Sequence, residues 1–550
     1  MSTATWIGGL SSIAAALSCG AGSSGSSRPG AGGSWAAGGA SGGDGKIATG
    51  GTAATGGNGT PGGGGAPGGT GNAGGGAATG GSETTTGGGA ATGGSGPAGG
   101  SAAAGSSATG GGVATGGNVP TGGGVVTGGS AAVGGSPAAA GGTTGAGGSV
   151  AGGPTNQSYL HNYFADRGHS EAETQAKIDD AWQKLFGGDT ANQSVYFPSG
   201  SNANGALASI RDIGNGDVRS EGMSYGMMIA VQTNHKAELD ALWNWAMTYM
   251  YHADAAHPAH GYFAWQMSFD GTELDPMPAP DGEQYFAAAL LFADSRWGSS
   301  TGIYDYKTRA TTLLKDLVHH DQVTGNTSKG TKTGNAIFNP TELEVRFSPD
   351  VANQTSNGDF TDPSYHLPAF YEAFARVGPA ADTSFWSTAA QKSRAFFLKA
   401  ANPTTGLTPD YANFDGSPKA ASWDAKTATF RYDAFRTVVN WSVDYAWNKK
   451  SKDEAALSNR LLTWFGASRA TSSGSLYLLD GTSQGPDNAL GLLACNAVGA
   501  LAADAAIAAP FVDALWSAGP PTGTWRYYDG MLYFLAVLHV SGQFRDWTLK

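Results

Sequence analysis

Residues 218–231 read VRSEGMSYGMMIAV, and this stretch has two interpretations that imply different folds. Gly222 to Gly226 match G-x-S-x-G, the turn between a buried strand and a helix that presents a serine nucleophile in many esterases. Alternatively, Glu221 is a carboxylic acid at the start of an apolar helix, where it would serve acid catalysis. Only the first interpretation requires a parallel sheet around Ser224.

The surrounding sequence favours Glu221. The residues ahead of the serine, RDIGNGDVRSE at 211–221, are polar and contain glycine, so they predict no buried strand. G-x-S-x-G also arises readily by chance in a chain with 89 glycines. The apolar run that follows predicts a buried helix at 222–234. An esterase that uses Ser224 stays open as an alternative.

The composition divides the chain into three regions: 1–19, 20–157 and 158–550. The middle region consists mostly of Gly, Ala, Ser and Thr, and buries too little apolar surface to offset its ordering entropy. We predict a long disordered linker there. The first region ends in the short apolar run GGLSSIAAALSCG, which predicts an export signal or a lipoprotein signal with lipid on Cys19. We therefore expect a secreted or cell-surface protein.

The third region, of about 390 residues, is large enough for one sizeable folded domain. The net charge of −12 argues against binding to nucleic acid, which requires basic patches. An acidic chain rich in tryptophan suits a neutral sugar polymer, because sugar rings stack on aromatic faces. No apolar run of membrane-spanning length occurs here. We expect Cys495 to be a buried thiol and the protein to be a monomer.

Helical periodicity dominates this region. A capping box of Ser170 and Glu173 opens a helix that ends at Gly187. Runs that alternate as strands do are short, as at 261–265 and 475–479. About twelve helices in pairs predict an all-α fold, an (α/α)6 barrel, and the lack of a fixed repeat argues against a helical solenoid. The further helices are expected near 236–251, 283–295, 304–319, 364–377, 382–401, 433–448, 453–466, 489–506, 508–516 and 529–541.

Several carboxylates open these helices. Glu221, Asp281 and Asp433 each precede an apolar helical run, and Arg436 follows Asp433 at a spacing that places both on one face. Each carboxylate taken singly is an ordinary cap that complements the helix dipole; Asp529 is a further example. In a barrel of paired helices, however, the inner helices begin at the same end, so these carboxylates would meet.

Six motifs in this order resemble glycoside hydrolase family 8, especially its xylan-acting branch, over about residues 160–546. The resemblance implies an (α/α)6 barrel and an inverting attack on β-1,4-linked sugars. The motifs are SEGMSYGMMIAV at 220–231, GYFAW at 261–265, APDGEQYFAAALLFADSRWG at 279–298, FTDPSYHLPAFYE at 360–372, FRYDAFRT at 430–437 and YYDGMLYFLAVLHVSG at 527–542.

The resemblance implies a role for each matching residue. Glu221 matches the general acid and Asp433 the general base of the xylan-active members. The remaining matches are expected to contact the sugar, the attacking water or the base: Asp281 holding the sugar, Tyr365 near the water, Trp265 stacking on a sugar, Arg436 orienting the base, and Tyr225 as a further substrate-binding residue.

Inversion requires an acid and a base on opposite sides of the sugar, roughly 6.5–9.5 Å apart, with a water between the base and the sugar. Glu221 must keep its proton near neutral pH, although a helix N-terminus favours the charged form. We expect partial burial and the nearby Asp281 to offset that effect. We expect Asp433 to remain ionised beside Arg436.

No cofactor and no metal are expected. The nearby His252, His257 and His260 lack the spacing of a zinc motif, so a loop with solvent-facing histidines is the simpler interpretation. Residues 270–275, DGTELD, lack the order of a calcium loop.

Two further alternatives stay open: hydrolysis of β-1,4-glucan or chitosan in the same fold, and a non-catalytic sugar-binding module. The mode of cleavage is a separate question. In exo-acting relatives, which release xylose from the reducing end, a Leu-His-Pro turn precedes a GLLATNA-like helix. Here Asn488 and Ala489 stand in place of His-Pro before GLLACNA. This difference favours endo cleavage slightly over reducing-end exo cleavage.

Overall fold

The computed structural model describes residues 160–351, 358–469, 474–485 and 489–549. The predicted signal segment 1–19, with Cys19, and the predicted linker 20–157 lie outside the described residues.

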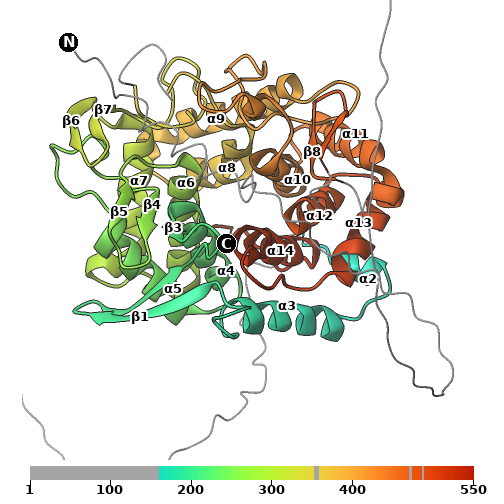
Figure 1. The fold of residues 1–550 in the computed structure, drawn as a ribbon, viewed down its shortest axis with the longest axis horizontal. Helices are drawn as coiled ribbons and strands as arrows, with labels where there is room; N and C mark the ends of the chain where they lie inside the picture. Colours follow the sequence, from blue (N-terminus) through green and yellow to red (C-terminus); the bar gives the residue numbers. More distant parts are fainter. Residues whose placement is uncertain (1–159, 352–357, 470–473, 486–488, 550) are drawn as a thin grey trace, which may run out of the picture. The chain divides into compact units, whose positions relative to one another are not determined.

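Six helices form an inner ring in which each contacts the next and the last returns to the first, as Figure 1 shows. An outer helix packs against each of them, so the predicted (α/α)6 barrel is confirmed and the solenoid is excluded. The inner helices are α4 (Ser220–Gln232), α6 (Pro280–Trp297), α8 (Pro368–Val377), α10 (Thr437–Asn448), α12 (Leu490–Val498) and α14 (Arg526–Val540). Their outer partners, in the same order, are α5 (Lys236–Trp245), α7 (Tyr306–His319), α9 (Thr383–Ala400), α11 (Lys452–Arg469), α13 (Ala505–Ser517) and α3 (Glu171–Leu185). A single turn, α2 (Tyr163–Asp166), precedes α3.

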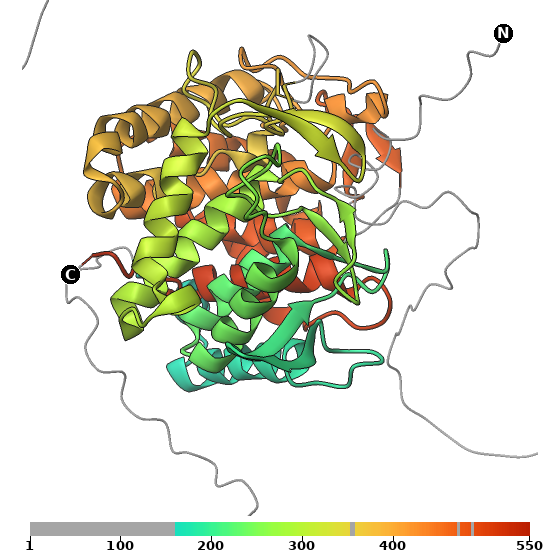
Figure 2. The ribbon, with the colours of Figure 1, turned by 90° about the vertical axis from the view of Figure 1, so that its left-hand side faces the viewer.

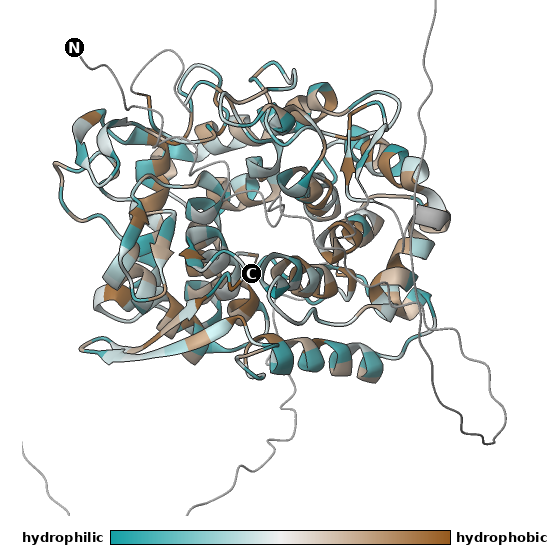
Figure 3. Ribbon diagram, in the orientation of Figure 1, coloured by the Kyte–Doolittle hydropathy of each residue, from teal (hydrophilic) through white to brown (hydrophobic). Residues whose placement is uncertain are grey.

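Inner and outer helices differ in sequence because they bury different fractions of their surface. Every residue of α4 is buried. In α3 only Thr174, Ile178, Ala181 and Leu185 are buried, at spacings of three and four that define one face. Figure 3 shows the contrast between the mostly hydrophilic α3 and the hydrophobic α12. The capping box at the start of α3 is present, since the Ser170 side chain accepts from the Glu173 backbone and the Glu173 carboxylate from the Ser170 backbone.

Several predicted helices are interrupted near their ends. The expected helix at 364–377 begins as a 3-10 turn, Pro363–Tyr365, and restarts at Pro368, because a proline favours the first turn of a helix and restricts the residue before it. The helix expected from 433 is likewise a 3-10 turn, Tyr432–Arg436, before α10. A π-helical turn, Ala246–Met250, ends α5. Further 3-10 turns lie at Gly302–Tyr304, Ala380–Asp382, Ala425–Ala428 and Gly499–Leu501.

More strands occur than the sequence predicted, all in antiparallel pairings. Those missed are short or rich in glycine and threonine. Of the two expected, 475–479 is confirmed in part by β8, whereas 261–265 precedes β4 and forms only an isolated bridge to Tyr251. The strands are β1 (Tyr196–Asn202), β2 (Gly205–Ile210), β3 (Asp217–Arg219), β4 (Gln266–Ser268), β5 (Glu273–Asp275), β6 (Val323–Thr327), β7 (Gly330–Gly334), β8 (Leu476–Tyr477) and β9 (Ser483–Gly485).

The strand β3 corrects one prediction. A buried strand does stand directly before α4, where none was expected. It is the edge of the antiparallel sheet β3-β4-β5, however, and not part of the parallel sheet that a serine elbow requires.

The two ends of the barrel are different. At one end the C-terminal segment crosses the ends of the inner helices: Gln232, the last residue of α4, exchanges hydrogen bonds of 2.8 and 2.9 Å with the backbone of Arg545, and Arg376 of α8 pairs with Asp546. Figure 2 shows the C-terminus on the left and the strands on the right. The end with the strands is where the inner helices begin.

Two glycines allow the inner helices to approach closely at this end. A Cβ atom on Gly282 of α6 would lie 2.6 Å from the Ser220 hydroxyl and 3.0 Å from the Ser220 carbonyl carbon. A Cβ atom on Gly222 of α4 would lie 2.5 Å from the ring of Tyr527. Both distances are too short for a side chain, so glycine is required where α4 meets α6 and α14.

Two further predictions concern Cys495 and membrane-spanning helices. Cys495 is buried, as predicted. Among the helices of the described residues, none combines the length and hydrophobicity that crossing a membrane requires.

The Gly282→Ala substitution is expected to lower the free energy of unfolding by about 1–3 kcal/mol, because the backbone of Ser220 cannot move aside without separating α4 from α6. Thermal or urea unfolding measures the effect. Gly519→Ala is the matched control, since a Cβ atom there meets nothing within 4 Å. Equal stability of the two variants would contradict this account of the helix contact.

Candidate active site

The candidate residues lie where the inner helices begin. Glu221 is the second residue of α4 and Asp281 the second of α6. Asp433 lies in the 3-10 turn that leads into α10, together with Arg436. The ring geometry therefore brings together side chains that are more than 200 positions apart in sequence.

The guanidinium of Arg436 joins these carboxylates. Its Nη1 atom donates to Asp281 Oδ2 at 2.6 Å and to Glu221 Oε2 at 3.2 Å. The Nη2 atom donates to Asp433 Oδ1 at 3.1 Å. The hydroxyl of Tyr225 accepts a further bond from Nη1 at 2.8 Å. One cation thus serves three acidic side chains.

This arrangement limits the distance between the predicted acid and base. Since both contacts end on one planar guanidinium, Glu221 Oε2 and Asp433 Oδ1 lie no more than about 9 Å apart, which is compatible with the roughly 6.5–9.5 Å of inverting glycosidases. All three carboxylates are buried, and Glu221, at 5 % exposure, is the most accessible of them.

Burial sets the protonation of Glu221. It raises the pKa of this carboxyl from 4.5 to about 7. The positive charge of Arg436 opposes the shift, the negative charge of Asp281 adds to it, and a hydrogen bond from Tyr527 lowers the pKa slightly. The expected combination of burial and Asp281 is therefore present, and Glu221 carries a proton well above the pH at which a free glutamate loses it.

The expectation that Arg436 keeps Asp433 ionised does not hold for this closed site. Burial raises the pKa of Asp433 well above its usual range, and Asp362, Glu221 and Asp281 raise it further, while Arg436 acts in the opposite direction. The physical reason is that one guanidinium cannot neutralise three contacting carboxylates, so the cluster retains at least one proton.

The backbone that carries Asp433 is held from both sides. Asp410 accepts from the backbone N–H of Ala434 at 3.2 Å, and the Tyr528 hydroxyl of α14 donates to the Tyr432 carbonyl at 2.9 Å. The adjacent Arg431 pairs with Asp424 at 2.7 Å. These contacts fix the short 3-10 turn in position relative to α14.

The predicted substrate contacts lie around this cluster. Tyr365 is fully buried with its ring 5.8 Å from the Arg436 guanidinium carbon, and its hydroxyl has no hydrogen-bond partner among the described residues. Trp265 lies beside the start of α4, where its carbonyl accepts from the Ser220 N–H at 3.0 Å. Tyr225 lies one turn deeper in α4, where it supports Arg436.

The remaining candidates have structural partners. Ser224 is buried inside α4 and donates to the Glu221 carbonyl at 2.9 Å, so its hydroxyl serves the helix backbone. Asp529 accepts from the Gly491 N–H at 2.9 Å at the start of α12, which is the capping arrangement. Residues 270–275 form the end of the turn between β4 and β5 and the whole of β5.

The three histidines were expected to face solvent, but each of them is half-buried. His252 stacks on His257 with ring centroids 3.8 Å apart, and His260 packs against His320. Across the described residues, no group of three or more His, Cys, Asp or Glu side chains is arranged to hold a metal ion.

Two site residues were missed from the sequence. Tyr527, the second residue of α14, donates to Glu221 Oε1 at 3.2 Å. Arg219, directly before α4, lies with its guanidinium carbon 5.9 Å from the ring centres of both Trp265 and Tyr527, and pairs with Asp212 and Asp217. The start of an inner helix, which identified Glu221 and Asp281, was a signal that also applied to Tyr527.

The barrel and its acidic cluster define a protein that acts on glycosidic bonds. The sequence profile of the glycosyl hydrolases family 8 matches residues 204–540, and the chain belongs to this family. It is 40 % identical over 386 residues to Rex8A of Paenibacillus barcinonensis, a reducing-end xylose-releasing exo-oligoxylanase, covering 70 % of this chain and 96 % of that protein.

Similar solved structures also come from proteins of family 8. A xylobiose complex of a family 8 protein from Teredinibacter turnerae is 51 % identical, with a TM-score of 0.69, and the match covers 70 % of this chain and 97 % of that one. A xylohexaose complex of a catalytic mutant, described as a xylanase from the same organism, matches with a TM-score of 0.68 and the same identity and coverage.

We expect activity to fall as the pH rises through about 7, because Glu221 acts as an acid only while protonated. Asp281→Asn removes a negative charge and is expected to move this alkaline limb of kcat/KM to lower pH by about 1 unit. Tyr527→Phe removes a hydrogen bond to the ionised form and is expected to move the limb to higher pH. The pH profiles of kcat/KM measure both shifts, and shifts in the same direction would contradict the assignment.

Proposed function

We propose that this protein hydrolyses β-1,4-xylosidic bonds in xylan or xylo-oligosaccharides with inversion at the anomeric carbon. The observation that carries the proposal is the Arg436 cluster, which holds a protonated Glu221 and a second carboxylate, Asp433, at a separation compatible with inversion. The relatives named for xylan chemistry support xylose as the sugar. Hydrolysis of β-1,4-glucan is the alternative. It is considered because the chain is also similar to more distant relatives such as endoglucanase 2 of Ruminiclostridium josui, at 24 % identity.

In the proposed reaction, Glu221 donates its proton to the glycosidic oxygen as the bond to the anomeric carbon breaks. Asp433, in its ionised form, takes a proton from a water that attacks the opposite face of the sugar. The productive state is the one in which the proton shared by the cluster resides on Glu221. Asp281 accepts hydrogen bonds from the sugar at the cleavage site, and Tyr365 holds the water, since its hydroxyl is otherwise unpaired.

Arg436 has two roles in this scheme. It favours the ionised form of Asp433, and its contacts with Glu221 and Asp281 keep the acid at the correct distance from the base. The second role requires a planar group with two donating ends, which a lysine ammonium does not provide.

Glu221→Gln and Asp433→Asn are each expected to reduce xylan hydrolysis at least about a thousandfold. An aryl β-xylobioside, whose phenolate leaves without protonation, distinguishes the roles: Glu221→Gln is expected to retain activity on it and Asp433→Asn is not. Product anomers followed by NMR report inversion.

Ser224→Ala is the matched control and is expected to hydrolyse xylan as the unmodified protein does. Loss of ester cleavage in this variant, with xylan hydrolysis absent throughout, would establish the esterase instead. Tight xylan binding without any product from the unmodified protein would establish a binding module, and preference for glucan or chitosan would replace the sugar assignment.

We further propose endo cleavage. The support is the replacement of His-Pro by Asn488 and Ala489 ahead of α12; Asn488 lies outside the described residues, and Ala489 directly precedes the helix, its N–H donating to the Ser475 hydroxyl at 2.7 Å.

A time course on xylohexaose tests this mode. Endo action is expected to give a spread of mid-length products from the first minutes. Early formation of xylose and xylopentaose alone would show reducing-end exo action.

A further inference from the structure

An exposed tryptophan lies at the end of the barrel that carries the site. Among the described residues, Trp525 is the most exposed large apolar side chain, at 48 %. It directly precedes α14, one of the inner helices, and therefore stands where these helices begin. A single exposed apolar side chain is common in proteins, so the support of this ring and its place near the site decide its role.

One face of its indole ring is covered. A Cβ atom on Gly214 would lie 2.3 Å from Trp525 Cε3 and 2.4 Å from Cζ3, so the ring lies directly on the glycine backbone. Gly214 belongs to the loop between β2 and β3. Because Gly214 covers this face, the exposed area comes from the opposite face and the ring edge. The side chain is thus a flat apolar surface with a rigid support.

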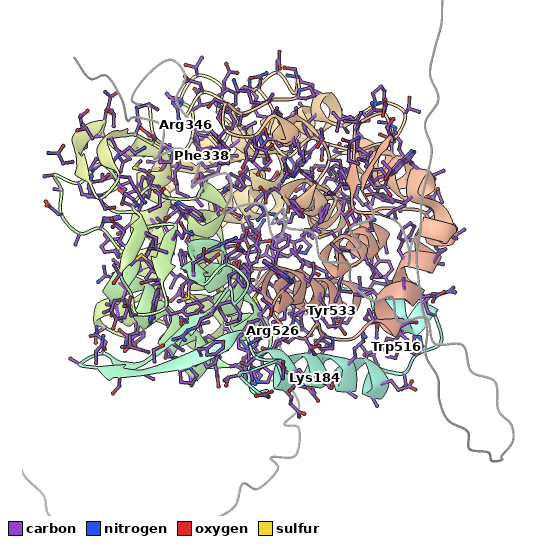
Figure 4. All side chains as sticks on the ribbon, viewed as in Figure 1. Lys184, Phe338, Arg346, Trp516, Arg526 and Tyr533 are labelled. Atoms are coloured by element: carbon purple, nitrogen blue, oxygen red, sulfur yellow. The ribbon has the colours of Figure 1, made fainter. Side chains whose placement is uncertain are left out.

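The backbone of Trp525 is fixed by its neighbour. Arg526, labelled in Figure 4, is fully buried and donates to the carbonyls of Gly523 at 2.6 Å, Thr190 at 2.7 Å and Ser194 at 2.9 Å. This side chain ties the start of α14 to the segment between α3 and β1. The ring therefore keeps its position without help from a ligand.

Trp525 is close in sequence to a residue that contacts the acid. Tyr527, two residues further along, donates to Glu221, and its own ring faces the guanidinium of Arg219. Arg219 in turn faces Trp265. Trp265, Arg219 and Tyr527 are thus neighbouring flat groups beside Glu221, and Trp525 precedes Tyr527 by two residues at the start of α14.

We propose that Trp525 is a stacking surface for a sugar ring of the substrate outside the cleavage site, and that it determines the preference for long chains. The proposal rests on the proposed function. Xylose rings carry C–H groups on both faces and no exocyclic CH₂OH group, so they stack closely on an aromatic ring. A rigid indole loses little entropy when it binds such a ring, which favours this use.

The test compares substrates of different length. Trp525→Ala is expected to lower kcat/KM for xylohexaose roughly tenfold, while kcat/KM for xylotriose changes by less than about twofold, because the shorter chain does not reach the indole. Trp525→Phe is expected to restore most of the loss. In a Glu221→Gln background, calorimetry is expected to show the same loss of xylohexaose affinity on Trp525→Ala.

A second variant removes the support and leaves the indole in place. Gly214→Ala places a methyl group against the ring and displaces it, in a backbone conformation that alanine adopts, and is expected to reproduce part of the effect. Leu398→Ala, at an apolar position of similar exposure on the outer helix α9, is the matched control. It is expected to leave kcat/KM unchanged for both substrates.

The outcomes separate this proposal from the proposed function. If the unmodified protein cleaves both substrates, and Trp525→Ala lowers kcat/KM equally for both or for neither, the stacking role is wrong while the hydrolase assignment stands. If the unmodified protein cleaves neither xylotriose nor xylohexaose, the proposed function is wrong.

Discussion

The structure of the site depends on one buried cation shared among three carboxylates. Arg436 lies inside the barrel, where burial removes the water that would otherwise stabilise Glu221, Asp281 and Asp433. Its charge permits the carboxylates to be buried together, and its inability to neutralise all of them keeps a proton in the cluster. An acid and a base follow from the same imbalance, because the proton can reside on one side chain while another is ionised.

The barrel supplies the geometry for this cluster. Six inner helices that begin at the same end bring Glu221, Asp281 and the turn of Asp433 together from distant parts of the sequence. Glycines such as Gly282 let the helix starts approach closely enough for one guanidinium to reach all three. The opposite end is covered by the C-terminal segment through Gln232 and Arg376, so the chemistry is confined to one end.

Much of this arrangement could be predicted from the sequence, for a physical reason. Amphipathic periodicity, the capping box at Ser170 and the unbroken apolar runs of inner helices such as α4 are local signals, and they identified the helices and the barrel. The acidic residues at helix starts were visible for the same reason. The hairpins β1-β2 and β6-β7 were missed because their sequences hold few large apolar residues at alternating positions.

Protonation and the partners of the cluster were harder to predict because they depend on the complete environment. The sequence shows Arg436 one turn after Asp433, but not that Glu221 and Asp281 use the same guanidinium. The state of Asp433 was misjudged for this reason. Tyr527 stands at the start of an inner helix, but its hydrogen bond to Glu221 and the position of Arg219 against its ring depend on the closed ring.

That closure has a consequence for how the chain is made. The inner ring is completed when α14, the last helix, packs between α12 and α4, and Arg526 ties the start of α14 to the segment that follows α3. A nascent chain emerging from the ribosome therefore carries five helix pairs with an open seam along α4 and α12 until α14 has emerged. During synthesis those apolar surfaces are available to chaperones, and the barrel becomes protected from proteolysis only once α14 has packed into the ring.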